Sequence, residues 1–285
     1  MPGDAAATSD KSQFVHHRIS SQPPPLAMRL RELLGSRDLF LILLGRELRV
    51  RYKQTALGVV WVILQPLVPA IILAIVFGAF ARLPSGGVPY LLFALSGLVL
   101  YGLFSSTVTR AGNSLIRDGA LITKIYFPRA LLPLASGSAG IVDLLVGLVV
   151  ILVLMVPLGY PPTPQLVAVP LIVALTLGLA LGLGIGVAAL SAHYRDFTLV
   201  VPFVLQLLLY ASPVVYSMEI LPPRLASLLA LNPLVPLIEG FRWSLLGTPP
   251  PTAEQIVLGS ASGLLMVALG LLVYSRASRD MADVI

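Results

Sequence analysis

Long apolar stretches separated by short polar segments recur along most of this 285-residue chain. A helix needs about 20 apolar residues to cross roughly 30 Å of hydrocarbon. Six stretches meet that requirement: residues 56–80, 88–109, 130–159, 165–192, 197–217 and 255–274. This pattern predicts an all-α integral membrane protein with six transmembrane helices.

A seventh apolar stretch, residues 225–246, is interrupted by Asn232, Pro233, Pro236, Glu239 and Arg242. We interpret it as a pair of re-entrant half-helices that dip in from the outside and bend at the prolines. Irregular backbone is tolerated at membrane depth only where protein or a water-filled cavity surrounds it. The alternative is a full crossing, which would make seven spans and turn the C-terminal basic residues outward.

A different kind of helix is predicted over residues 36–54, before the first span. Ser36 is a suitable N-cap. Apolar residues follow at helical spacing, from Phe40 through Leu43 and Leu44 to Leu48, and basic residues occupy other faces. This is the pattern of an amphipathic helix that lies in the membrane interface. Such a helix either moves during function or serves only as an anchor.

The composition fits a membrane protein with an inside N-terminus. Hydrophobic residues make up 57% of the chain and charged residues 11%, against roughly 25% charged in soluble domains. With six spans, 16 of the 19 Lys and Arg residues fall on the cytoplasmic side, as the positive-inside rule requires. Residues 1–35 are predicted to be a flexible cytoplasmic tail without a cleavable signal peptide, and both termini are predicted to be cytoplasmic. The net charge of +6 therefore reflects cytoplasmic loops, and no nucleic-acid partner is predicted.

Residues that could carry catalysis are scarce. There is no cysteine, and the three histidines show no metal-ligand spacing. A glycine-rich phosphate-binding loop is missing from the sequence, so energy must come from another polypeptide or an ion gradient. Proton coupling would need acids inside the membrane, but Asp143 fits a structural role and Glu239 sits three residues from Arg242 as a neutralising partner. We predict no catalytic residue, metal site or cofactor in this chain, and neither a proton-driven carrier nor a membrane enzyme is favoured.

The loop between the second and third spans mixes charged and apolar residues. Residues 113–128 are predicted to form a short cytoplasmic helix ending at Pro128, with both faces occupied. Docking into a groove on a soluble partner would explain this pattern, and so would a helix that touches only lipid. Glycines in the fourth span, at 178, 182, 184 and 186, are interpreted as sites of close helix packing.

Four sequence blocks and the chain end resemble the permease subunit of type-2 ABC exporters, in the branch that exports O-antigen and teichoic acid. The blocks are RELRVRYKQTALGVVWVILQPL at 46–67, LITKIYFPRALLPLA at 121–135, YRDFTLVVPFVLQLLLYASPVVYS at 194–217, and LNPLVPLIEGFRW at 231–243. The ending DMADVI resembles the family's terminus, with Met281 where an aromatic is usual. Each block is weak alone, but their order is specific.

The resemblance implies a homodimer that pairs with two ABC ATPase subunits, which bind ATP and magnesium, in the inner membrane of a bacterium. The implied cargo is a polysaccharide on a polyprenyl diphosphate lipid. The implied ATPase-coupling residues are Arg117, Asp118, Leu121, Lys124, Tyr126 and Phe127. The helix over 36–54 corresponds to a cytoplasmic gate. Residues 225–246 correspond to an outer gate, with Asn232, Pro233, Glu239 and Arg242 as its candidates.

Two groups of residues suit that cargo chemically. Arg46, Arg49, Arg51, Tyr52 and Lys53 lie near the headgroups, where the four basic side chains would attract a diphosphate. Trp61, Tyr101, Phe104, Phe203 and Tyr210 could line a channel and stack on sugar rings. Aromatic residues near span ends are also typical interface residues, and mid-span Phe is typical packing. The alternative function is export of another amphiphile, such as a drug or a simple lipid.

Overall fold

The computed structural model describes residues 35–53, 58–124 and 127–277, with the side chains of 51–53, 58–59 and 122–124 left aside. All regular elements of the described residues are helices, as predicted. Its elements in order are α2 (Arg37–Lys53), α3 (Gly58–Leu73), the π-helical η1 (Ala74–Phe80), α4 (Tyr90–Arg117), α5 (Gly119–Lys124), α6 (Leu131–Ser138), α7 (Gly140–Met155), η2 (Pro164–Ala168), α8 (Val169–His193), α9 (Phe197–Tyr210), η3 (Met218–Ile220), α10 (Pro223–Leu229), α11 (Leu234–Leu246) and α12 (Ala253–Ala277).

Within the described residues, five helical segments are long and apolar enough to cross a membrane. They are Val60–Phe80, Tyr90–Arg117, Leu131–Met155, Pro164–His193 and Ala253–Ala277. Each one coincides with a predicted span. A helix with more than 20 consecutive, mostly apolar residues is stable only where lipid or protein surrounds it. The prediction of an all-α integral membrane protein is therefore confirmed.

The span predicted at 197–217 is shorter than expected. Its helix, α9, covers 14 residues and ends at Tyr210, which corresponds to about 21 Å of helix. Pro213 disfavours helical backbone at Ser212, and a turn follows there. The residues after Tyr210 are also largely apolar, so the sequence pattern predicted a span that extends beyond the end of the helix.

Helix α4 is the centre of the bundle and packs against α3, α6, α7, α8, α9 and α11. Small residues let it approach α8 closely. A Cβ atom at Gly112 would lie 2.5 Å from Val187 Cγ1, and one at Gly184 would lie 2.6 Å from the Cβ of Ala111. Helices in lipid associate through such small-residue contacts, because apolar burial supplies little driving force there.

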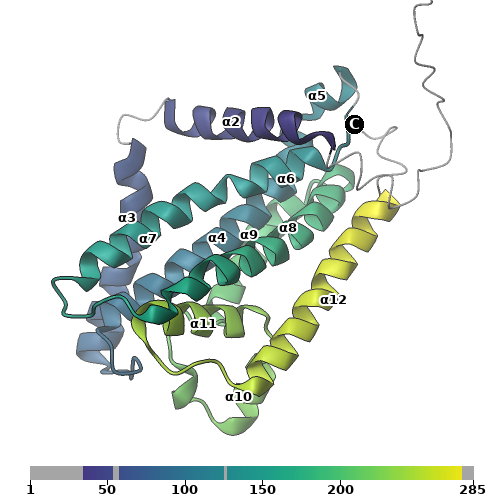
Figure 1. Ribbon diagram of the computed structural model, residues 1–285. Coiled ribbons are helices and arrows are strands. Elements are labelled where there is room, and N and C mark those ends of the chain that lie inside the picture. Colours follow the sequence, from purple (N-terminus) through teal and green to yellow (C-terminus); the bar gives the residue numbers. More distant parts are fainter. Residues whose placement is uncertain (1–34, 54–57, 125–126, 278–285) are drawn as a thin grey trace, which may run out of the picture.

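The two ends of the bundle carry different elements (Figure 1). Helix α2 crosses one end beside α5, and α10 and α11 lie at the opposite end, where α12 begins. The helices α10 and α11 meet at an angle of 98° across the break that contains Asn232 and Pro233. The predicted bend is thus present at the first of the two proline positions, whereas Pro236 lies inside α11.

Candidate functional site

Helix α2 packs on the bundle rather than touching lipid alone. Leu43 is buried in a cluster with Leu115, Leu131, Leu132, Ala135, Ala188 and Ala189. Phe40 and Leu44 pack against the same cluster, while Leu41, Ile42 and Val50 are exposed. The amphipathic pattern therefore has a protein-facing stripe, and α2 is held against α6 and the end of α4.

Four charged residues join α2 to the junction of α4 and α5. Arg46 Nη2 lies 2.7 Å from Asp118 Oδ1 and 3.3 Å from Glu47 Oε1. Arg117 Nη2 pairs with Glu47 and lies 3.1 Å from Asp118 Oδ2. We call Arg46, Glu47, Arg117 and Asp118 the charge network. Burial alone would lower the pKa of Arg46, but its bonds to Asp118 and Glu47 hold that pKa above its usual value.

The charge network connects two groups of residues that the sequence suggested for separate roles. Arg46 belongs to the predicted diphosphate-binding group, and Arg117 and Asp118 belong to the predicted coupling segment. Both arginines pair with Asp118 and also with Glu47, which sequence reasoning did not single out. Nothing in the local sequence signals this pairing, because it depends on α2 folding back over α4.

The predicted diphosphate-binding group is only partly described. Arg49 is exposed, and its Nε donates to the backbone carbonyl of Gly45 at 3.2 Å. The side chains of Arg51, Tyr52 and Lys53 lie outside the described residues. Arg46 therefore differs from Arg49 in facing protein carboxylates.

The predicted coupling helix over 113–128 is divided in the structure. Residues 113–117 continue α4, Asp118 ends that helix, and the six-residue α5 follows at Gly119. Leu121 is half-buried. Phe127 packs against the α2 cluster rather than standing free. Tyr126 and the side chain of Lys124 lie outside the described residues.

A cavity of about 380 Å³ lies among η3, α10, α11 and the start of α12, and a second one of about 540 Å³ lies among α3, α4, α7 and α9. The second, which we call the intramembrane cavity, has a hydroxyl-bearing face on α4 formed by Tyr101, Ser105, Ser106 and Thr109. Gln65 adds an amide from α3. The hydroxyls of Ser105, Ser106 and Thr109 each donate to a backbone carbonyl three or four residues back on α4, and a hydroxyl oxygen can still accept from a polar ligand.

An ion pair lines the intramembrane cavity beside these hydroxyls. Arg110 Nη2 donates to Asp143 Oδ2 at 3.2 Å, and both side chains line the cavity. Asp143 therefore joins α7 to α4, which agrees with the structural role expected for it. Arg110 lies seven residues before the end of α4, on the half of the helix that approaches α2.

The aromatic residues predicted to line a channel are spread over different surroundings. Tyr101 lines the intramembrane cavity, and its hydroxyl donates to the carbonyl of Leu205. Phe104 is only 2% exposed and belongs to the protein core. Trp61, Phe203 and Tyr210 lie on outward faces of α3 and α9 in the single chain, each 62% exposed. The hydroxyls at 105, 106 and 109, which recur at helical spacing in the sequence, were the signal that sequence reasoning did not use.

The residues predicted for the outer gate converge on the turn after α9. Asn232 Nδ2 donates to the carbonyl of Ala211 at 3.1 Å and to Ser212 Oγ at 2.9 Å. Its Oδ1 accepts from the backbone N–H of Leu234 at 3.0 Å, next to Pro233, the N-cap of α11. The Asn232 side chain thus accepts a hydrogen bond at the start of α11 and links the bend between α10 and α11 to the turn after α9.

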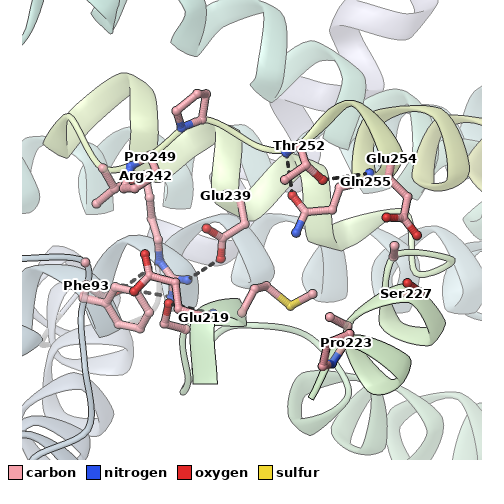
Figure 2. A pocket seen from close by; sticks show the side chains of 17 residues that line it. Phe93, Glu219, Pro223, Ser227, Glu239, Arg242, Pro249, Thr252, Glu254 and Gln255 are labelled. Atoms are coloured by element: carbon pink, nitrogen blue, oxygen red, sulfur yellow. Dashed lines mark hydrogen bonds and ion pairs between the residues drawn. The ribbon is translucent and has the colours of Figure 1, made fainter. Parts of the chain in front are cut away.

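Arg242 is the most enclosed charged residue of this region, with no exposed surface. It donates to the carbonyls of Phe93 at 3.2 Å, Pro213 at 2.5 Å and Val214 at 2.8 Å, and to Glu239 Oε1 at 3.3 Å. Its guanidinium carbon lies 3.5 Å from the centre of the Phe93 ring. Figure 2 shows Arg242 and Glu239 beside Phe93. Arg242 thereby ties α11 to α4 and to the turn after α9.

No group of three or more His, Cys, Asp or Glu side chains is placed to hold a metal ion in the part of the chain that the structure describes. The polar residues instead form contacts between helices, a lined cavity and a bent helical pair. These are parts of a membrane transport subunit.

The family model for the ABC-2 type transporter matches residues 38–246. This chain belongs to the ABC-2 type transporter family, as its sequence blocks suggested. It is similar to the O-antigen export system permease protein RfbA of Klebsiella pneumoniae, at 26% identity over 249 residues, which cover 87% of this chain and 95% of the relative. It is also similar to the RfbA permease of the same description from Myxococcus xanthus, at 27% identity over 256 residues, covering 89% and 98%.

Proposed function

We propose that this chain is the membrane subunit of an ATP-driven exporter that moves a polyprenyl-diphosphate-linked polysaccharide, an O-antigen or a similar glycan. Two relatives matched over most of their length are described as O-antigen export permeases. The observation that carries the proposal is the intramembrane cavity, with hydroxyls of Ser105, Ser106 and Thr109 beside the pair of Arg110 and Asp143. The lining is otherwise mostly apolar, so these hydroxyls and the ion pair are the groups that would bind sugar, and the described function of the two relatives favours a glycan over a drug or a simple lipid.

Its partners would be a second copy of this chain and two ABC ATPase subunits, which bind ATP and magnesium. The absence of a glycine-rich phosphate-binding loop from the sequence supports this division, because the chain cannot hold ATP phosphates by that route. The assembly would lie in the inner membrane of a bacterium with both termini cytoplasmic. The distribution of Lys and Arg supports that orientation.

The cargo would enter at the α2 end. Arg49 is exposed there and available to the diphosphate, and Arg51 and Lys53 extend the basic run. The sugars would follow past Arg110 to the hydroxyls of α4, which exchange hydrogen bonds with sugar hydroxyls at little net cost. The ATPase would dock on α5 and, through the charge network, act on α2.

Removal of the cavity hydroxyls tests this function. The triple variant Ser105→Ala, Ser106→Ala and Thr109→Val is expected to lower export roughly tenfold in vesicles that contain the permease, its ATPase and lipid-linked glycan, since losing one or two hydrogen bonds to the glycan, at about 1 kcal/mol each, corresponds to roughly that factor. Cargo-stimulated ATP hydrolysis should fall with it, while basal hydrolysis is unchanged. The permease alone should hydrolyse no ATP.

Ser262→Ala is the matched control, because its hydroxyl on α12 bonds a backbone carbonyl three residues back, as Ser106 does, but lies outside the cavity. Its export should equal that of the wild type. Unchanged export by the triple variant would contradict the proposed path. Stimulation of ATP hydrolysis by a simple lipid or drug, with no response to lipid-linked glycan, would favour the other amphiphile class.

A further inference from the structure

Helix α3 presents a polar edge to the intramembrane cavity. Val62, Gln65 and Pro66 line that cavity from α3. They lie three and four residues apart, so they share one face of the helix. Gln65 follows Gly58, the first residue of α3, by seven residues, which corresponds to about 10 Å along the helix axis. Its amide is therefore placed within an apolar span rather than at the end of one.

The Gln65 side chain is open to a ligand in the cavity. Gln65 is exposed in the single chain, and no hydrogen bond joins its amide to another of the described residues. A glutamine amide carries an acceptor oxygen and an NH₂ group with two donors. Such a group is costly within a membrane span unless it finds a hydrogen-bond partner. A polar ligand in the cavity would supply that partner.

Two prolines give the same edge of α3 free backbone acceptors. Pro66 and Pro69 lie inside the helix. Because proline has no backbone N–H, the helical hydrogen bonds to the carbonyls of Val62 and Gln65, four residues back, cannot form. No described side chain donates to either carbonyl. Membrane helices tolerate proline where another group satisfies the freed carbonyl, and both carbonyls here belong to residues that line the cavity.

The facing wall on α4 also offers mainly acceptors. The hydroxyls of Ser105, Ser106 and Thr109 donate to carbonyls of their own helix, so their oxygen lone pairs are what they present to the cavity. A ligand that fits between these walls must donate hydrogen bonds at several points. Sugar hydroxyls do so, whereas acyl chains and their ester groups have no donors. The volume of about 540 Å³ is that of a small-ligand site.

From this arrangement we propose that Gln65 is a specificity-determining residue for the sugar part of the cargo. Its amide would bind two neighbouring hydroxyls of one sugar ring, donating to the first and accepting from the second, while the freed carbonyl of Val62 accepts from a further hydroxyl. This inference rests on the proposed function, because it takes a glycan as the cargo of the cavity. It adds the residue that distinguishes hydroxyl-bearing sugars from an amphiphile without donors.

Reactivity of a cysteine at position 65 tests whether glycan reaches this edge. The native chain has no cysteine, so Gln65→Cys in the reconstituted exporter can be followed with a water-soluble methanethiosulfonate reagent. Lipid-linked glycan extracted from the source bacterium, at about ten times its half-saturating concentration, should slow the reaction roughly tenfold, because only about a tenth of the sites stay free. Leu64→Cys is the matched control, since Leu64 is exposed on α3 but lies outside the cavity lining. Equal slowing at both positions, or none at position 65, would overturn the proposal.

Gln65→Leu tests the role of the amide itself. It should raise the glycan concentration needed for half-maximal ATP hydrolysis about five- to tenfold, through the loss of one or two hydrogen bonds, and it should leave the thermal unfolding midpoint and the dimer intact. Gln206→Leu is the control, because Gln206 is an exposed glutamine of α9 outside the cavity lining, and its glycan response should equal that of the wild type. Membrane glutamines also bond to neighbouring chains, so loss of the dimer in Gln65→Leu would overturn the proposal, as would an unchanged glycan response.

Pro66→Ala tests the freed carbonyl of Val62. Alanine restores the N–H and the helical bond, and it suits a helix better than proline, so the variant should unfold at a higher temperature and yet need several-fold more glycan. Pro202→Ala, inside α9 and outside the cavity lining, should be stabilised without a change in glycan response. An unchanged response in Pro66→Ala would remove the Val62 carbonyl from the site. All of these comparisons are made in an exporter whose wild type responds to glycan, so their failure would leave the proposed function standing, whereas a wild type without that response would contradict the proposed function itself.

Discussion

Gly97 of α4 and Arg242 of α11 are packed so closely that no side chain fits between them. A Cβ atom at Gly97 would lie 2.7 Å from Nη2 of Arg242 and 3.2 Å from the Cα of Val214. Because Gly97 has no side chain, the buried guanidinium has room to lie where it donates to its carbonyl acceptors. This contact joins the centre of the bundle to the bent pair α10–α11.

Gly97→Ala should destabilise the protein by about 1–3 kcal/mol, because an added methyl group must displace either the guanidinium or the Val214 backbone. Gly102→Ala on the same helix is the control. Nothing lies within 4 Å of a Cβ atom at Gly102, and the change from Gly to Ala should favour the helix by up to about 1 kcal/mol. Thermal unfolding in detergent measures both, and equal midpoints would contradict the packing argument.

Arg242→Met should be more damaging than Gly97→Ala. It leaves the carbonyls of Phe93, Pro213 and Val214 without their donor and Glu239 without its partner, and breaking a buried pair costs about 3–5 kcal/mol. Glu239→Gln should be much milder, because the amide oxygen still accepts from Arg242. Limited proteolysis of the α9–α12 region should therefore accelerate strongly in the first variant only. If Glu239→Gln were cleaved as fast, Arg242 would act through charge rather than through its carbonyl bonds.

The parts that the sequence predicted well depend on composition over many residues. Spans follow from length and hydropathy, and the bend at Asn232-Pro233 follows from residues that cannot continue a helix. The parts missed depend on contacts between distant segments. The pairing of Arg46 with Asp118 requires α2 to fold back, and the burial of Phe104 depends on which face of α4 meets the core.

The sequence-based predictions differ from the structure at two further points, the end of α9 and the lining of the cavity. The α9 end is marked by Ser212 and Pro213, yet the apolar residues beyond them extended the predicted span. Aromatic residues were chosen as channel candidates for their affinity for sugar rings, whereas the cavity lining is richer in small hydroxyl side chains. The spacing of Ser105, Ser106 and Thr109 alone could not show which helix face was free.

Helices α12 and α8 approach each other closely at Gly270 and Gly182. A Cβ atom at Gly270 would overlap the carbonyl oxygen of Gly182, and one at Gly186 would lie 2.7 Å from the Cα of Gly270. Gly270→Ala should push the helices apart and cost about 1–3 kcal/mol, because backbone atoms cannot move aside as a side chain can. Gly178→Ala is the control on α8, where nothing lies within 4 Å. Only Gly270→Ala should lower the thermal unfolding midpoint.

Cysteine labelling should place both ends of the α10–α11 pair on one side of the membrane. The native chain has no cysteine, so single substitutions report without background. Arg224→Cys and Pro249→Cys, both at exposed positions, should react with an impermeant reagent from outside intact cells. Ser278→Cys should react only after the membrane is opened. Labelling of positions 224 and 249 from opposite sides would mean that the pair crosses.

The roles of Arg46 and Arg49 should separate in a comparison of two single variants. Arg46 is bonded to Asp118 and Glu47, so Arg46→Gln should weaken the hold of α2 on the α4–α5 junction. Arg49 is exposed, so Arg49→Gln should weaken capture of the cargo diphosphate. In the reconstituted exporter, the first variant should lower the maximal rate of cargo-stimulated ATP hydrolysis, and the second should raise the cargo concentration needed for half of that rate.

A double-mutant cycle with Asp118→Asn makes the first half of this prediction quantitative. Because the Arg46 side chain is 35% exposed and that of Asp118 is 11% exposed, solvent screens the pair, and we expect a coupling free energy of about 1 kcal/mol or less in thermal unfolding. Once Asp118 is replaced, Arg46 keeps only its bond to Glu47, so Arg46→Gln should have a smaller effect on the stability and on the hydrolysis rate than it has in the wild type. Additive losses would show that Arg46 acts apart from Asp118. The charge network would then not be the link between the coupling segment and α2, and Arg46 would belong with Arg49 among the residues that meet the cargo.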